Sequence, residues 1–458
     1  MEKRKNIIII SIYIIALIMF NIKINYYQKN IYIYPDECSH IAYIAYLEQT
    51  NKLIPEFENM KELSIGTFLK EYDNSIDERE VATKIQEAVK SGEDVTIKLN
   101  ENTINHLGHP PLYYHIMKIF NIVNVENGEV TYNLRELRNA SQVLANIGLI
   151  LAFIIGYKKL KSVTSNLIYA SLIVCVPQLS FISGAVSNDV LSLVGVNVFL
   201  LGAIRLEEKN RNYLTYFLIA IGIFICALNK LTALTILFFA CIFIIILLTI
   251  REKNLKFIFC KQALATLPIY MLILAYFIII YTRYGAINPS LIHINPEYYR
   301  LTEFYDTDIY VPAYSLKYYA KIFWQGFLNY WAGYEYYRES TNFNQVIPSA
   351  LIILFPFINL IYKKIKKEKI DIVNISVALS TIIAIIIQFV RQCIEFYTVS
   401  GYLGGNQPRY YLCVMPSFML LISEVVEKSI SKDKKNIKKI IYIAICVGYI
   451  ASIEIGLW

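Results

Sequence analysis

Three side chains with the potential for chemistry stand within five residues near the start of the chain: Asp36, Glu37 and His40. Asp36 and His40 are four residues apart, so they share one face of a helix. A carboxylate beside an imidazole can transfer a proton, bind a divalent metal, or do neither. The structural alternative is that Pro35 starts a helix, Asp36 caps it and His40 lies on its surface.

A second histidine precedes two prolines in the segment HPPLYYH at 109–115. Proline is accepted in the first turn of a helix but not in its interior, so a short interfacial helix is expected to begin here. His109 then lies just before that helix. It either belongs to the helix start or provides a second polar group that faces Asp36.

Three cations lie where apolar runs begin, and an aspartate lies at a fourth such position. Each cation could anchor the chain at a membrane interface by extending to lipid headgroups. Alternatively, the cations could bind a phosphate, for which a planar guanidinium is well suited. The aspartate is either an N-cap or a second carboxylate near Asp36. The cations are Arg138, Lys230 and Arg409, and the aspartate is Asp189.

Aromatic residues are concentrated in the segment FWQGFLNYW at 323–331. Trp and Tyr are enriched at membrane interfaces, which is one explanation. Their flat faces and polar tips also suit sugar rings. Tyr113, Trp324 and Trp331 are therefore the candidates to contact a sugar or an acceptor.

The elements that must position these residues are long apolar segments. The chain has 458 residues, of which 56% are hydrophobic, and a mean hydropathy of +0.44. About 20 apolar residues cross a bilayer as a helix. The sequence therefore predicts an all-α integral membrane protein with about eleven transmembrane helices. The candidate spans are 6–24, 138–157, 163–182, 189–204, 212–228, 231–250, 262–282, 347–362, 371–390, 410–426 and 439–456.

These spans divide the chain into five parts. The expected parts are a first transmembrane helix (1–24), a large loop with juxtamembrane helices and an acidic insert (25–137), core transmembrane helices (138–282), an aromatic-rich loop (283–346) and C-terminal transmembrane helices (347–458). All five histidines fall in the long loops. We find almost no ionisable residue deep inside a span, which disfavours an ion-coupled transporter.

Basic residues are concentrated in alternate short loops. By the positive-inside rule these loops and the N-terminus are cytoplasmic, and the long loops are extracytoplasmic. The net charge of +8 therefore reflects plasma-membrane topology and does not indicate nucleic-acid binding. The eight cysteines show no metal-type spacing and no disulfide framework. The basic segments are 3–5, 158–161, 205–211, 251–256, 363–369 and 428–439.

Taken in order, these segments resemble the GT-C superfamily of polytopic glycosyltransferases, which use polyprenyl-phosphate sugars. The superfamily includes protein O-mannosyltransferases and the aminoarabinose transferases of lipid A. The chain is most similar to a bacterial family of predicted membrane proteins with the motifs PDExxH, HPPLYY, VSND, an FW-containing segment and QGRY. The counterparts here are PDECSH, HPPLYY, VSND, FWQGF and QPRY, in which Pro408 replaces the glycine.

The resemblance implies a GT-C-like helical bundle with an active site at the extracytoplasmic face. A sugar would move from a polyprenyl phosphate to a hydroxyl of a cell-envelope glycan, lipid or protein. Such a reaction needs a base near the hydroxyl and cations near the leaving phosphate. The expected roles are Asp36 as base, Glu37 and Asp189 as further catalytic carboxylates, His40 and His109 as supporting groups, and Arg138, Lys230 and Arg409 as phosphate ligands.

No cofactor is required by this scheme, because cations alone can neutralise a monophosphate. A diphosphate donor would favour Mg²⁺ or Mn²⁺, with Asp36, Asp189 and His109 as ligands. Two other functions stay open at this point. One is a non-catalytic protein, either a transporter or a scaffold of a surface-polysaccharide machine. The other is a polysaccharide polymerase or ligase that uses a diphosphate-linked lipid.

Overall fold

The computed structural model describes residues 2–31, 34–63, 78–99, 107–301, 315–332, 354–355, 357–365, 368, 371–397, 405–431 and 437–454. It is 77% helical, with almost no strand. Within this part of the chain, seven helices are long and apolar enough to cross a membrane. The number is eight if the bent pair α6–α7 counts as one span. The protein is thus an all-α, multi-pass membrane protein.

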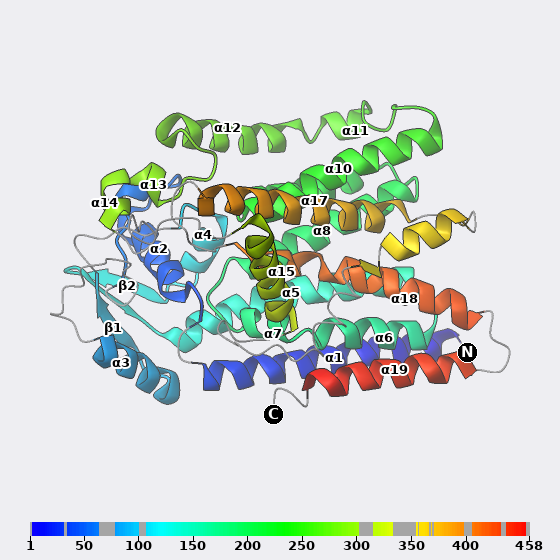
Figure 1. Ribbon diagram of the computed structural model, residues 1–458, viewed down its shortest axis with the longest axis horizontal. Coiled ribbons are helices and arrows are strands. Elements are labelled where there is room, and N and C mark those ends of the chain that lie inside the picture. Colours follow the sequence, from blue (N-terminus) through cyan, green and yellow to red (C-terminus); the bar gives the residue numbers. More distant parts are fainter. Residues whose placement is uncertain are drawn as a thin grey trace.

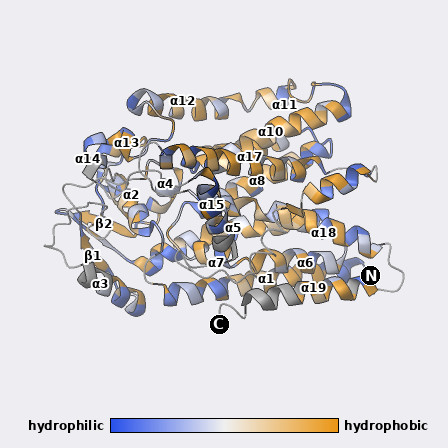
Figure 2. Ribbon diagram, in the orientation of Figure 1, coloured by the Kyte–Doolittle hydropathy of each residue, from blue (hydrophilic) through white to orange (hydrophobic). Residues whose placement is uncertain are grey.

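The long helices run side by side as a bundle, and their apolar residues lie along its length (Figures 1 and 2). The seven spans are α1 (Glu2–Asn30), α5 (Leu134–Lys159), α8 (Asp189–Glu207), α10 (Leu231–Glu252), α11–α12 (Lys261–Leu264 and Leu267–Tyr284), α17 (Ile372–Glu395) and η3–α18 (Pro408–Val414 and Met415–Ser431). The other bundle helices are α6 (Val163–Val174), α7 (Pro177–Ser183), α9 (Tyr213–Ala227) and α19 (Ile437–Glu454), and α15 (Leu316–Ala332) runs across the bundle in Figure 1.

The predicted count of eleven spans is not confirmed. The expected span at 163–182 bends by 60° between α6 and α7, where Pro177 cannot donate a helical hydrogen bond. The expected span at 212–228 forms α9, which has 15 residues and falls below the length of the seven spans. Part of the expected span at 347–362 lies outside the described residues.

A small antiparallel sheet lies at one end of the bundle, which we call the sheet end (Figure 1). Its strand order is β1-β3-β2. Asn127 and Gly128 join β2 to β3 with φ values of 51° and 81°. Two positive values are typical of the tight type I′ turn that Asn-Gly favours. The strands are β1 (Val95–Lys98), β2 (Val123–Glu126) and β3 (Glu129–Tyr132).

Short helices pack around this sheet at the same end (Figure 1). The helix expected after the two prolines is present and begins at Leu112. The helix that carries His40 is also present and is almost entirely buried. The short helices are α2 (Glu37–Thr50), η1 (Phe57–Asn59), α3 (Glu78–Ser91), α4 (Leu112–Lys118), α13 (Leu291–Ile294) and α14 (Pro296–Leu301).

Helix α8 lies at the centre of the bundle and packs against α5 and α9. Its crossing with α9 is close because glycines face it. A Cβ on Gly222 of α9 would lie 2.4 Å from the backbone nitrogen of Phe199. Small residues allow helix backbones to approach closely in membrane bundles. This packing holds Asp189, the first residue of α8, at the sheet end.

Candidate functional site

Four helix N-termini converge at the sheet end, and each brings one charged side chain. Asp36 precedes α2, Asp189 begins α8 and Lys230 precedes α10. Arg409 lies in η3, which packs directly against α8 and α10. We call Asp36, Asp189, Lys230 and Arg409 the ion-pair cluster. All four were predicted site residues, and the fold brings them together from distant parts of the sequence.

The first ion pair joins Asp36 to Arg409. Arg409 donates through Nη2 to Oδ2 of Asp36, and its Nη1 lies 3.5 Å from the carbonyl oxygen of Pro35. The Arg409 side chain is 6% exposed and that of Asp36 is 28% exposed. The arginine is therefore largely enclosed, whereas the carboxylate keeps a solvent-accessible side.

Asp36 occupies the N-cap position of α2, but its side chain makes no capping hydrogen bond. Its backbone adopts φ 61°, in the left-handed region. This conformation costs an L-residue roughly 1–2 kcal/mol. The predicted alternative of an ordinary side-chain cap is therefore wrong, because the carboxylate contacts Arg409 and not the first turn of α2.

The second ion pair joins Lys230 to Asp189. Lys230 donates through Nζ to Oδ1 of Asp189, and Ser187 Oγ donates to Oδ2 at 3.2 Å. Both charged side chains are buried, at 7% and 6% exposure. Burial lowers the pKa of Lys230, and the charge of Asp189 opposes that effect. The carboxylate thus stabilises a cation that would otherwise be costly at this depth.

Tyr410 connects the two pairs. Lys230 Nζ lies 4.7 Å from the centroid of its ring, and Arg409 Cζ lies 5.5 Å from it. Cations within about 6 Å of an aromatic face are attracted by the ring quadrupole. The ring therefore holds both cations close together and makes the two pairs one site.

His40 and His109 stack beside the cluster, with ring centroids 6.3 Å apart. His40 Nδ1 lies 2.9 Å from the hydroxyl oxygen of Tyr114, and Tyr43 donates to the carbonyl of His109 at 2.8 Å. Burial lowers the pKa of His40 well below its ordinary value of 6.5. Asp36 opposes this effect, and the charges of the nearby cations reinforce it. His40 is therefore neutral at pH 7.

Glu37 and Arg138 form a separate, fully enclosed ion pair. Arg138 donates from Nε to Oε1 at 2.9 Å and from Nη2 to Oε2 at 2.7 Å. The backbone N–H of Val186 donates to Oε1 at 3.0 Å. Arg138 Nη1 also donates to the carbonyl of Ile31 at 3.0 Å. Both charged side chains are at most 2% exposed. The sequence predicts that these two groups contact the substrate, but in the structure they bind other protein groups.

The predicted aromatic contacts are dispersed. Tyr113 is fully buried, and its hydroxyl donates to Ser141 at 3.1 Å. Trp324 is 39% exposed on α15 and stacks on Phe389, with centroids 6.1 Å apart. The side chain of Trp331 lies outside the described residues. Of the two side chains that the structure describes, Trp324 is the exposed one.

Several polar groups of the site were not singled out as site residues from sequence. Asn188 and Asn229 exchange hydrogen bonds, with Asn229 Nδ2 donating to the Asn188 carbonyl at 2.8 Å and Asn188 Nδ2 to the Asn229 carbonyl at 3.2 Å. Their Oδ1 atoms, and Oγ1 of Thr232, are buried without a hydrogen-bond partner among the described residues. In the sequence, their positions beside Asp189 and Lys230 are the feature that could have identified them as site residues. Likewise, Tyr410 directly follows Arg409.

The three residues expected to hold a metal do not form a metal site. Within the part of the chain that the structure describes, no group of three or more His, Cys, Asp or Glu side chains is close enough to bind an ion. Asp36 and Asp189 are instead each paired with a cation. We therefore derive no step through a metal.

No protein-family model matches the chain, and neither a curated protein nor a solved structure matches it significantly. A relation to lipid-linked-sugar transferases therefore depends on the motifs and on the geometry of the ion-pair cluster.

Proposed function

We propose that this protein is a GT-C-type membrane glycosyltransferase. It transfers a sugar from a polyprenyl phosphate to a hydroxyl of a cell-envelope acceptor, at the extracytoplasmic face of the plasma membrane. The observation that carries the proposal is the convergence of the two carboxylate–cation pairs on Tyr410. This arrangement combines a partly exposed carboxylate with two clustered cations, which are the groups that the reaction needs.

The cations would bind the donor phosphate. Arg409 offers a planar fork of N–H groups and Lys230 offers a compact charge, and both suit phosphate oxygens. The N-termini of α2, α8 and α10 lie at the same place, and each contributes a partial positive charge. Because the cluster itself carries two positive and two negative charges, these helix termini supply the additional attraction for an anion.

Asp36 would act as the base. It removes the proton of the acceptor hydroxyl as the oxygen attacks the anomeric carbon of the sugar. The bond between that carbon and the phosphate oxygen breaks, and the lipid phosphate leaves with the electron pair. Arg409 orients the carboxylate of Asp36 through their ion pair and would stabilise the negative charge that develops on the phosphate.

The remaining residues would position the reactants. Asp189 would orient Lys230, to which its carboxylate is paired; the sequence predicts a catalytic carboxylate at this position. Asn188 and Asn229 would hold the N-termini of α8 and α10 together, since each side-chain amide donates to the other's backbone carbonyl. We assign Glu37 and Arg138 to holding the first long loop in place, since their ion pair joins α2 to α5.

The orientation in the membrane is supported by the other end of the bundle. At that end, ion pairs connect helix ends that carry basic residues. Lys159 Nζ lies 3.3 Å from Glu208 Oε1, and Arg251 Nη1 lies 3.3 Å from Glu207 Oε1. The ion-pair cluster lies at the opposite, sheet end. The positive-inside rule then makes the N-terminus cytoplasmic and the cluster extracytoplasmic.

The test is transfer of radiolabelled sugar in membranes that contain polyprenyl-phosphate sugars. Asp36→Asn should lower transfer by at least about 100-fold, the scale of general-base catalysis, at unchanged expression and elution volume. Glu87→Gln, on the exposed face of α3, is the matched control and should transfer normally. Equal transfer by wild type and Asp36→Asn would overturn the assignment of the base. Substrate flux through liposomes that contain purified protein, without transfer, would favour a transporter.

A further inference from the structure

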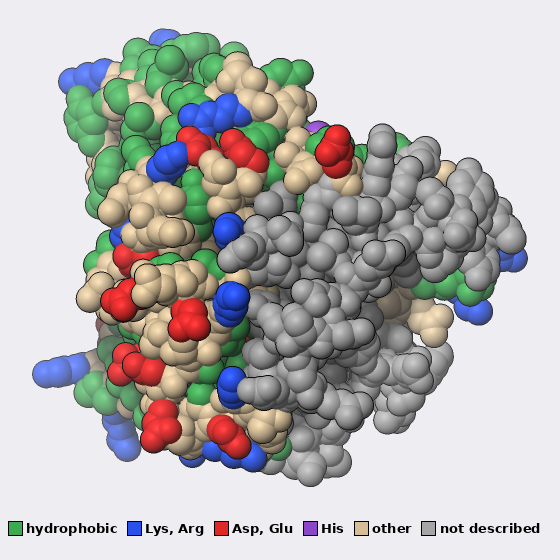
Figure 3. All heavy atoms as spheres, turned by 90° about the vertical axis from the view of Figure 1, so that its left-hand side faces the viewer, with side chains coloured by type: hydrophobic (Ala, Val, Ile, Leu, Met, Phe, Trp, Pro, Cys, Tyr) green, Lys and Arg blue, Asp and Glu red, His purple; other side chains and the backbone are tan. Residues whose placement is uncertain are grey.

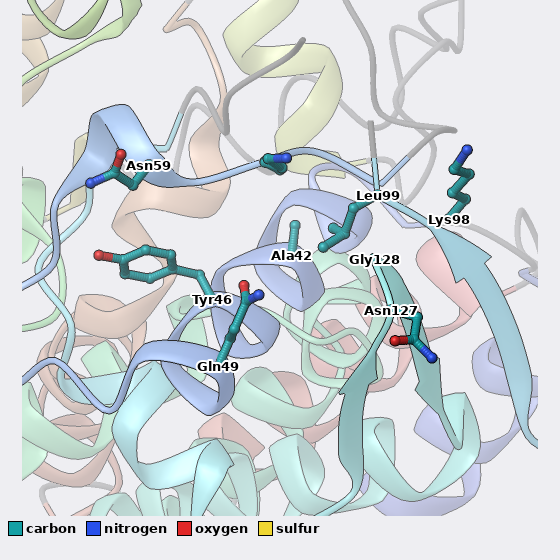
Figure 4. A pocket seen from close by; sticks show the side chains of 9 residues that line it. Ala42, Tyr46, Gln49, Asn59, Lys98, Leu99, Asn127 and Gly128 are labelled. Atoms are coloured by element: carbon teal, nitrogen blue, oxygen red, sulfur yellow. The ribbon is translucent and has the colours of Figure 1, made fainter. Parts of the chain in front are cut away.

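A second polar site lies on the other side of α2. It is a pocket of about 120 Å³ between α2, the loop around η1 and the sheet (Figure 4). Ala42, Tyr46 and Gln49 line it from α2. These residues are spaced by four and three positions and so share one helical face. His40 lies on a different face, about 150° around the helix at 100° per residue, and Asp36 precedes the helix. The pocket is therefore distinct from the ion-pair cluster.

Backbone hydrogen bonds hold the walls of this pocket in place. Leu99 N–H donates to the carbonyl of Gly128 at 2.8 Å, which ties the end of β1 to the hairpin turn. Leu63 pairs with Leu99 in an isolated bridge, which fixes the loop that follows η1. The Tyr46 hydroxyl accepts a hydrogen bond from Glu56 N–H at 3.0 Å. The pocket is thus part of the folded sheet end.

The lining has the chemistry of a binding site for an anionic sugar. Lys61 and Lys98 supply positive charge, and none of the described lining residues is acidic. The described part of the sheet end that faces the viewer in Figure 3 carries both acidic and basic side chains. Three side-chain amides, those of Gln49, Asn59 and Asn127, can both donate to and accept from hydroxyl groups.

The size of the pocket limits the ligand. Its volume is well below the roughly 300–1,000 Å³ that drug-sized ligands occupy. A single small unit, such as one sugar ring, fits that limit. The buried ring of Tyr46 and the side chain of Leu99 provide apolar surface against which one face of a sugar can pack.

We propose that this pocket binds one sugar unit that bears a carboxylate or a phosphate group. This unit belongs to the acceptor glycan, an identification that rests on the proposed function. Ala42 lies six residues after Asp36 and Gln49 thirteen, which places the pocket about 9 to 20 Å along the helix axis from the base. The unit held here is therefore a different one from the unit that reacts. The pocket selects a charged acceptor chain.

The experiment measures binding by purified full-length protein without any sugar donor. The probes are an oligogalacturonate, a glycerol-phosphate oligomer and a neutral maltooligosaccharide of similar length, each with a fluorescent label. The test variant is Lys61→Gln combined with Lys98→Gln. Lys317→Gln, an exposed lysine on α15, is the matched control. The double variant Lys61→Arg and Lys98→Arg keeps the charge.

We expect at least one anionic probe to bind, and the better probe identifies a carboxylate or a phosphate as the recognised group. The double glutamine variant should bind it at least tenfold more weakly, and the control and double arginine variants should bind normally. The inference is overturned if no anionic probe binds, if the neutral probe binds equally well, or if Lys317→Gln weakens binding as much as the double variant.

These results are independent of the proposed reaction. Anionic-glycan binding in a protein that shows no sugar transfer would refute the transferase and leave a glycan-binding site. Transfer without anionic-glycan binding would refute the pocket assignment alone.

Discussion

Lys230 and Arg409 lie against the same aromatic ring, that of Tyr410, with Nζ 4.7 Å and Cζ 5.5 Å from its centroid. Each cation is also paired with its own carboxylate, Asp189 for Lys230 and Asp36 for Arg409. The two carboxylates offset the repulsion between the two cations, which can therefore lie close to the same ring. The donor phosphate that we propose would contact both cations.

The first prediction concerns the ring itself. Tyr410→Phe keeps the aromatic face, so the KM for the lipid donor should stay within about threefold of wild type. Tyr410→Leu removes a contact worth about 0.5–2 kcal/mol, so KM should rise by roughly tenfold. Transfer kinetics over a range of donor concentrations test both variants. Equal effects of phenylalanine and leucine would show that the hydroxyl, and not the ring, matters.

The second prediction distinguishes a structural role of Glu37 from the catalytic role of Asp36. Glu37→Gln leaves the buried Arg138 charge without its partner, which should lower the free energy of unfolding by about 3–5 kcal/mol. Thermal unfolding in detergent should show a clearly lower Tm, whereas Asp36→Asn should lower the Tm less, because the Asp36 carboxylate is 28% exposed and Glu37 is only 2% exposed. A Glu37→Gln protein of normal Tm but without transfer would instead support the catalytic role predicted from sequence.

The third prediction concerns pH. The pKa of His40 is lowered by burial, so the unfolded chain binds a proton here at a higher pH than the folded protein does. Stability from neutral His40 is therefore fully present above about pH 6.5 and is lost as the pH falls through the lowered folded-state value. We expect the Tm of wild type to fall more steeply between pH 7 and pH 5 than that of His40→Gln. Parallel curves for the two proteins would contradict this.

The fourth prediction concerns metals. If the donor is a monophosphate held by Arg409 and Lys230, chelation with EDTA should leave the transfer rate within about twofold of its starting value. Restoration of lost activity by Mg²⁺ or Mn²⁺ would instead indicate a diphosphate-linked donor and a metal-dependent polymerase or ligase. Treatment with EDTA that has been presaturated with Ca²⁺ serves as the control.

Features that depend on local sequence could be predicted from the sequence. Apolar length predicts a multi-pass helical membrane protein, because the bilayer demands about 20 residues per span, but it does not give the number of spans, since the expected span at 163–182 bends between α6 and α7. The start of α4 follows from two prolines, since proline has no N–H to donate. The Asn127–Gly128 dipeptide is also a hairpin signal, but the predicted all-α fold contains no strands.

The partners of the charged residues were decided by tertiary structure. Asp36 and Glu37 are adjacent in sequence, but Asp36 precedes α2 with a left-handed backbone (φ 61°), whereas Glu37 is the first residue of the helix. Asp36 consequently meets Arg409, 373 residues away, whereas Glu37 meets Arg138, 101 residues away. Sequence identified all four as candidates for one site. Only the packing of η3 against α8 and α10 decided which pair joins the ion-pair cluster and which is enclosed in the protein interior.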